Sequence, residues 1–245
     1  MSRNFFRENR KRVQQNILDS NFLLPLVANT SICIEEKKAK YDNHLKKVII
    51  ENIPVSPDDI RPQSWLIELE IEHPTWGMPQ GGKKAEKAIV VLGSDAMRIF
   101  IFEMKTTLEP FSGSNPITIF QKFEHSINRI LSLLPIYIFE NEYNDMPLYF
   151  KAIVFYNHEK WTSVTDENFK IQNRTILKCF QNGNGHIEFE NMGVSDELEL
   201  FFFRNSNSNL GELIVDFRDF FIEEWEHNAA IEGNLTCPIL KSMPN

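Results

Sequence analysis

Cysteine is scarce in this chain of 245 residues. Its three cysteines, Cys33, Cys179 and Cys237, are widely spaced, so the sequence suggests neither a zinc cluster nor a disulfide framework. The opening stretch MSRNFFRENRKRVQQ lacks the apolar run of a signal peptide, and no later apolar run is long enough to span a bilayer. We therefore expect a protein of the reducing cytoplasm that has no membrane segment.

The motifs of several common enzyme classes are also missing. The sequence contains no G-x-x-x-x-G-K-[ST] phosphate loop, no H-E-x-x-H zinc motif, no G-x-S-x-G nucleophile motif and no dinucleotide-binding glycine fingerprint. Its six histidines are scattered along the chain. Zinc proteolysis, serine hydrolysis and nicotinamide chemistry therefore find little support.

The charge is acidic overall but unevenly distributed. The net charge is -8; residues 1–105 hold 16 Lys+Arg and 14 Asp+Glu, a balance of +2, and residues 106–245 hold 10 and 20, a balance of -10. We expect any contact with a polyanion to lie in the first half, and we expect the acidic second half to suit a protein partner or a second copy of the chain.

Hydrophobic residues make up 42% of the chain, which is ordinary for a globular protein, and the length suits a single domain spanning residues 1–245. The apolar spacing predicts an N-terminal helix at 4–18, one or two strands within 30–63, a strand at 64–72, strands at 85–93 and 97–105, a helix at 116–134, a strand at 148–156 and a C-terminal helix at 210–225. Residues 157–200 are expected to form loops and short strands, with a turn at QNGNGH.

Charged residues interrupt the two apolar strands of AEKAIVVLGSDAMRIFIFEMKTT. A tight turn centred on Ser94 and Asp95 would pair residues whose numbers sum to 189, so Glu103 would face Glu86. Side chains alternate across a strand, so Lys105 should project from the same face as both carboxylates. Two carboxylates and one ammonium are therefore predicted to converge at one end of a central hairpin.

Two carboxylates held side by side in a partly buried position repel each other and persist only if positive charge lies between them. Mg²⁺ suits such hard oxygen ligands and is often shared with substrate phosphates, which is the chemistry of phosphodiester hydrolysis. In that reading Lys105 orients the nucleophile or stabilises charge on the phosphate. A second reading needs no metal: the carboxylates form an internal salt-bridge cluster with Lys84 and Lys105.

The order of strand, turn, strand ending in FEMKTT, helix and strand resembles the PD-(D/E)xK nuclease superfamily over roughly residues 5–156. The resemblance implies an α+β fold with a central mixed β-sheet flanked by helices, a restriction-endonuclease-like core and a C-terminal elaboration of strands and a helix at 157–245. It implies Mg²⁺ or Mn²⁺ held by Glu86 and Glu103, with Lys105 completing the catalytic set. The chain departs from the family at Glu86, where Asp is usual; we expect the other nearby acid, Asp95, to be a turn residue.

The resemblance also suggests peripheral residues, for each of which an ordinary solvent-facing or ion-paired role is at least as good an explanation. The acidic candidates are Glu8 and Glu70, and the nucleic-acid-binding candidates are Lys83, Lys84, Gln121 and Lys122. The implied function is a Mg²⁺-dependent endonuclease that cuts DNA in preference to RNA, in restriction or phage defence. The alternative is a catalytically inactive subunit of the same fold that acts as a binding or scaffolding protein.

Overall fold

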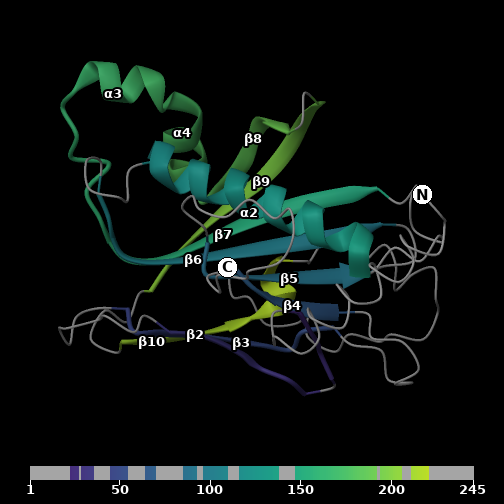
Figure 1. Ribbon diagram of the computed structural model, residues 1–245. Coiled ribbons are helices and arrows are strands. Elements are labelled where there is room, and N and C mark those ends of the chain that lie inside the picture. The colour runs from purple at the N-terminus through teal and green to yellow at the C-terminus, as the bar shows by residue number, and fades with distance from the viewer. Residues whose placement is uncertain are drawn as a thin grey trace, which may run out of the picture.

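A computed structural model shows the architecture of the chain (Figure 1). It describes residues 23–27, 29–35, 45–54, 64–69, 85–92, 96–109, 116–137, 147–191, 194–205 and 211–220. The expected N-terminal helix at 4–18 lies outside these residues, as do Glu8, Glu70, Lys83, Lys84 and Asp95.

The centre of the molecule is a mixed seven-stranded sheet in the order β1-β4-β5-β6-β7-β9-β8. Its strands are β1 (Leu23–Pro25), β4 (Ser64–Glu68), β5 (Lys87–Leu92), β6 (Met97–Leu108), β7 (Leu148–Glu159), β8 (Asn184–Asn191) and β9 (Val194–Arg204). The strands from β1 to β6 pair antiparallel, β6, β7 and β9 run parallel, and β8 returns antiparallel to β9. The predicted central mixed sheet is thus confirmed.

The pairing of β5 with β6 has the register that the sequence predicts. Lys87 faces Phe102 and Leu92 faces Met97, and both pairs of numbers sum to 189. Both strands are buried through most of their length, because layers cover both faces of the sheet.

Helices cover one face of this sheet. They are α2 (Pro116–Tyr137), α3 (Glu167–Gln172) and α4 (Arg174–Asn182) (Figure 1). Apolar residues of α2 that recur every three or four positions, including Phe123, Ile127 and Ile130, pack with Ile99 and Ile101 of β6 in one core cluster. The predicted helix at 116–134 and strand at 148–156 are therefore confirmed with small extensions.

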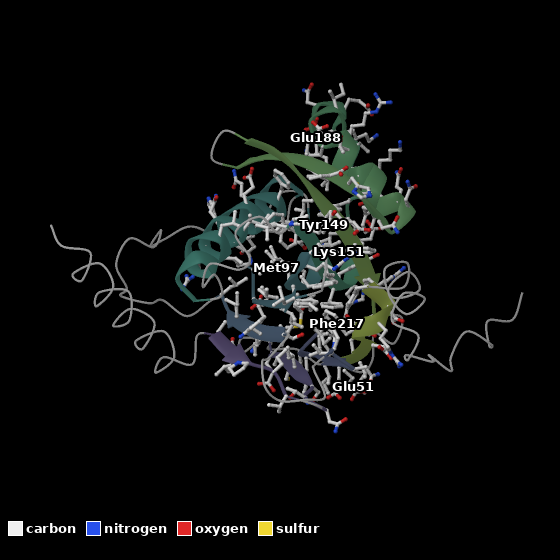
Figure 2. The ribbon with its side chains drawn as sticks, turned by 90° about the vertical axis from the view of Figure 1, so that its right-hand side faces the viewer. Glu51, Met97, Tyr149, Lys151, Glu188 and Phe217 are labelled. Atoms are coloured by element: carbon white, nitrogen blue, oxygen red, sulfur yellow. The ribbon has the colours of Figure 1, made fainter. Side chains whose placement is uncertain are left out.

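A second, smaller sheet covers the opposite face (Figure 1). It contains β2 (Ile32–Glu35), β3 (Lys47–Glu51) and β10 (Glu212–Asp216), in the order β10-β3-β2. The 3₁₀ turn η1 (Phe217–Phe220) follows β10, and the Phe217 ring lies 4.6 Å from that of Phe100 on β6. Figure 2 shows Phe217 between Met97 and Lys151 of the large sheet and Glu51 of β3, as expected for a residue that joins the two layers.

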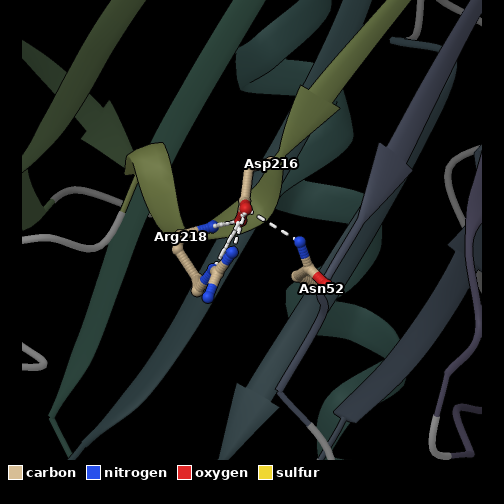
Figure 3. A network of polar contacts seen from close by, with 3 residues as sticks. All are labelled: Asn52, Asp216 and Arg218. Carbon is tan, nitrogen blue, oxygen red and sulfur yellow. Dashed lines mark hydrogen bonds and ion pairs between the residues drawn. The ribbon is translucent and has the colours of Figure 1, made fainter. Parts of the chain in front are cut away.

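A polar network fixes the junction of β10 and η1 to the end of β3 (Figure 3). The Asp216 carboxylate accepts hydrogen bonds from the Arg218 guanidinium, from the Arg218 backbone N–H at 2.9 Å and from the Asn52 side chain at 2.7 Å. The Arg218 side chain is the main reason why the pKa of Asp216 lies below its ordinary value. The network holds the phenylalanines of η1 in the core between the sheets.

The predicted C-terminal helix at 210–225 is wrong over its described part, residues 211–220. Leu213 and Val215 belong to a strand that pairs parallel with β3, and a one-turn 3₁₀ segment follows. Phe217 and Phe220 are three residues apart, so one 3₁₀ turn places both rings on the same side, and both are buried. A spacing of three satisfies a short 3₁₀ turn as well as an α-helix, which is why the spacing misled.

The expectation of loops and short strands at 157–200 is also wrong, because α3 and α4 occupy 167–182 and β8 and β9 are long. The sequence carried two signals for the helices. Asp166 caps α3 by accepting hydrogen bonds from the backbone of Asn168 and Phe169, and Gly183 ends α4 with a positive φ of 84°. The expected turn at QNGNGH is in fact the end of α4 and its passage into β8.

None of the helices in the described part of the chain is long and apolar enough to cross a membrane.

Candidate active site

The predicted acid and lysine of β6 project from the face that α2 covers. Ile99 and Ile101 belong to the core cluster under α2, and Glu103 and Lys105 follow at the same alternation. Glu103 is completely buried, with 0% of its side chain exposed, whereas 19% of the Lys105 side chain is exposed. The structure therefore places a carboxylate inside the core, with a lysine leading from it toward solvent.

Two ammonium groups contact the buried carboxylate, and both contact the same oxygen. Lys105 Nζ lies 2.6 Å from Glu103 Oε1, and Lys122 Nζ, on α2, lies 2.5 Å from it. The other oxygen, Oε2, is also buried and has no hydrogen-bond partner among the described residues. One side of the carboxylate is thus neutralised by lysines, and its second oxygen retains the capacity to accept or to ligate.

The pKa of Lys105 reflects this environment. Burial opposes the charged ammonium and lowers the pKa, but the attraction and hydrogen bond of Glu103 outweigh it, so the net pKa is above the ordinary value. The charge of Glu86 raises it further. Lys105 therefore stays protonated at neutral pH and can act as a fixed positive charge rather than as a base.

Glu86 directly precedes β5, and the β5–β6 ladder ends at Lys87 and Phe102, so the ladder does not include the expected pairing of Glu86 with Glu103. The Glu86 carbonyl accepts from the Leu69 N–H at 3.3 Å, which continues the β4–β5 register, but its backbone N–H donates to the Phe102 carbonyl at 3.0 Å, one residue out of the β5–β6 register in which Lys87 faces Phe102. Glu86 is half-buried, and its carboxylate is close enough to raise the pKa of Lys105. The structure thus brings Glu86, just before β5, and Glu103 and Lys105, on β6, to one end of the hairpin.

A serine of α2 fixes the helix against this end of the hairpin. Ser126 Oγ accepts a buried hydrogen bond from the Ala85 backbone N–H at 2.9 Å and donates to the Lys122 carbonyl at 2.7 Å. Ala85 immediately precedes Glu86, so one side chain ties the start of β5 to the turn of α2 that carries Lys122. Sequence reasoning did not identify Ser126; a serine among the apolar residues of an amphipathic helix was the available signal.

The two nucleic-acid-binding candidates on α2 differ in solvent exposure. Gln121 is exposed, but only 15% of the Lys122 side chain is exposed, because its ammonium group points to Glu103. Lys122 therefore belongs to the same charged cluster as Lys105. The salt-bridge alternative named Lys84 as the second lysine, and the structure shows Lys122 in contact with the buried carboxylate.

The donors suit a hard divalent cation. Oε2 of Glu103 is a buried oxygen without a hydrogen-bond partner among the described residues, and Glu86 adds a second carboxylate. Mg²⁺ is commonly held by one or two carboxylates together with water and substrate phosphate. Within the described ranges, His, Cys, Asp and Glu side chains form no group of three or more that could hold a metal ion, so Glu86 and Glu103 would need oxygens from substrate or water to complete the shell.

Comparison with known proteins gives no family for this chain: no protein-family model, curated protein or solved structure matches it.

Proposed function

We propose that the protein is a Mg²⁺-dependent nuclease of the PD-(D/E)xK type that hydrolyses phosphodiester bonds, in DNA in preference to RNA. The observation that carries the proposal is the buried Glu103 carboxylate, with two lysines on one oxygen and the other oxygen without a hydrogen-bond partner among the described residues. A buried carboxylate costs free energy, and that cost is understandable at a site where its charge serves a reaction. Restriction or phage defence is the cellular role that the family resemblance favours.

In this proposal Glu86 and Glu103 hold the cation, and Lys105 and Lys122 provide fixed positive charge beside it. A bound divalent cation supplies Lewis acidity, which activates water and offsets negative charge on a phosphate under attack. Lys105 is held in place by Glu103 and stays protonated, so it can stabilise the same developing charge without reorganisation. Ser126 keeps Lys122 in position by fixing its turn of α2.

A non-catalytic subunit of the same fold is the second candidate. The observation that favours it is that Lys105 and Lys122 already neutralise the Glu103 carboxylate, so the cluster could be purely structural. The excess of acid over base in residues 106–245 would then serve a protein partner or a second copy. A titration with Mg²⁺ or Mn²⁺ separates the candidates, because a purely structural cluster binds neither ion.

The decisive experiment measures cleavage of supercoiled plasmid DNA, and of RNA in parallel, with Mg²⁺, Mn²⁺, Ca²⁺ or excess chelator. We expect cutting with Mg²⁺ or Mn²⁺, none with chelator, and inhibition by Ca²⁺, whose looser coordination positions the reacting groups poorly. Glu103→Gln should abolish cutting. Cleavage that persists in chelator, or in Glu103→Gln, would rule out the proposed mechanism.

Glu68→Gln is the matched control. Like Glu103, Glu68 on β4 is a carboxylate paired with a lysine, Lys87 of β5, although 23% of its side chain is exposed, and it is not one of the proposed metal ligands. The same chemical change there should leave cleavage at the wild-type rate. Equal losses in both variants would indicate that breaking any buried ion pair of this sheet damages the protein.

A further inference from the structure

A pocket of about 310 Å³ lies where the chain leaves β7 and enters the helices α3 and α4. Its wall combines aromatic rings with cationic side chains: Trp161, Phe180, Lys170, Arg174 and Lys178. Neither the proposed catalytic cluster nor any sequence motif accounts for this combination.

The pocket gathers positive charge within the half of the chain that is acidic overall. Residues 106–245 contain ten Lys+Arg, and three of the ten lie within 170–178. Lys170 pairs with Glu167 at 2.8 Å, whereas Arg174 and Lys178 form no ion pair with any described residue. Two exposed positive charges without a described ion-pair partner therefore line a hollow in the acidic half of the chain.

Arg174 and Lys178 also share one face of α4. They are four residues apart, so they lie about one helical turn, or roughly 6 Å, from each other along the axis. The apolar wall formed by Leu177 and Phe180 strengthens the attraction of these charges for an anion, because it excludes water from one side. Consecutive cations on such a wall suit the regularly spaced phosphates of a nucleic-acid strand.

A row of packed side chains connects the pocket to the proposed catalytic cluster. Tyr156 of β7 is the register partner of Lys105 on β6, and both lie on the helix-covered face of the sheet. The Tyr156 ring lies 5.6 Å from that of Phe180, which lies 5.2 Å from that of Trp161. The pocket and Lys105 are therefore at the same end of the parallel strands, with Tyr156 and Phe180 between them.

We propose that the pocket binds backbone phosphates of the nucleic-acid strand that the catalytic cluster cuts, with Arg174 and Lys178 as the contacting cations. The inference rests on the proposed function for the identity of its partner. It places a substrate contact in the half of the chain whose net charge of -10 argued against one. The acidic surroundings then confine the strand to the pocket instead of letting it coat the surface.

The test is the binding of a labelled single-stranded oligonucleotide of about 20 nucleotides by full-length Glu103→Gln protein, followed by fluorescence anisotropy over a range of NaCl concentrations. Adding Arg174→Ala and Lys178→Ala to this background should weaken binding by about tenfold or more. The slope of log affinity against log salt should also become shallower by about 0.7 or more, which is the value for each phosphate of a single strand that the protein ceases to neutralise.

The matched control adds Lys46→Ala and Lys47→Ala, which remove the same charge from the start of β3 in the smaller sheet. This pair should leave the affinity within about twofold of its parent. The variant Arg174→Gln with Lys178→Gln removes both charges but keeps part of each aliphatic stem, and it should bind as weakly as the alanine variant; a thermal melt of each protein identifies any folding defect. Unchanged binding in the pocket variants, or an equal loss in the control, overturns the inference.

The binding experiment and the cleavage experiment can fail independently of each other, so they test the pocket assignment and the nuclease proposal separately. If wild-type protein cuts nothing but binds the oligonucleotide through the pocket, the nuclease proposal fails and the pocket assignment stands. If wild-type protein cuts with Mg²⁺ and the pocket variants bind and cut equally well, the nuclease proposal stands and the pocket assignment fails. Absence of any oligonucleotide binding by the wild type and by Glu103→Gln refutes the pocket assignment directly.

Discussion

Lys122, on helix α2, places its ammonium nitrogen 2.5 Å from the fully buried Glu103 carboxylate, on strand β6. The contact joins residues of two separate elements and converts a charged position in the core into part of a cluster with Lys105. Both the catalytic and the purely structural interpretation of the site depend on this contact. Variants at the site can therefore be tested by their free energy of unfolding as well as by their cleavage activity.

We predict that Glu103→Gln lowers the free energy of unfolding by about 2 kcal/mol, because it leaves two partly buried ammonium groups without their shared carboxylate. Lys122→Met should cost less in the Glu103→Gln background than in the wild type, since its partner is then already gone. Urea unfolding of the two single variants and the double variant measures the coupling. Strictly additive effects would show that the contact contributes nothing to stability.

The raised pKa of Lys105 predicts a loss of stability at high pH. A lysine whose folded pKa exceeds its unfolded value of about 10.4 stabilises the protein fully below that pH, and the contribution disappears as the pH rises through the folded pKa. Wild-type protein should therefore lose stability above about pH 10.4 more steeply than Lys105→Met. Thermal unfolding between neutral and alkaline pH measures this, and parallel curves would contradict it.

Removing or shortening the Glu86 side chain tests whether its carboxylate binds the metal ion. Glu86 lies at the same end of the hairpin as Glu103, and its charge raises the pKa of Lys105, so Glu86→Ala should lose metal binding and cleavage together, whereas Glu86→Asp should keep substantial activity. Metal titration and plasmid cleavage measure the two properties. Asp95→Asn is the control and should change little; an inactive Asp95→Asn beside an active Glu86→Ala would mean that Asp95 supplies the second carboxylate.

The Asp216 network predicts a loss of stability in acid. Mainly because Arg218 donates to its carboxylate, the folded pKa of Asp216 lies below the unfolded value of about 3.9. Its contribution is present above that value and is lost as the pH falls through the folded pKa. Asp216→Asn should therefore melt at a lower temperature than wild type at neutral pH, and the difference should shrink below about pH 4.

Asp219 provides the contrasting control, because burial, aided by the charge of Asp216, raises its pKa. Its ionised form is therefore disfavoured by folding, and Asp219→Asn should leave the neutral-pH melting temperature unchanged or higher. Melting curves recorded for both variants across the acidic range measure this difference in sign. A lower melting temperature for Asp219→Asn at neutral pH would contradict the assignment.

Local patterns were sufficient for the hairpin and the helix beside it. The turn between β5 and β6 sets the register, and alternation then decides that Glu103 and Lys105 share a face. Helical spacing identified α2 over almost its whole length. Local spacing failed at 211–220, because Phe217 and Phe220 suit a 3₁₀ turn as well as an α-helix and only the pairing of β10 with β3 distinguishes them.

The sequence shows that Lys122 is polar and helical, and these properties predict a solvent-facing lysine that could contact nucleic acid. Its real position depends on how α2 lies across the sheet, which the apolar packing around Phe123 and the Ser126 hydrogen bond to Ala85 decide. The grouping of Arg174 and Lys178 with Trp161 likewise requires α4 to fold back over the end of β7. Such juxtapositions arise from packing between distant segments, and no pattern within either segment encodes them.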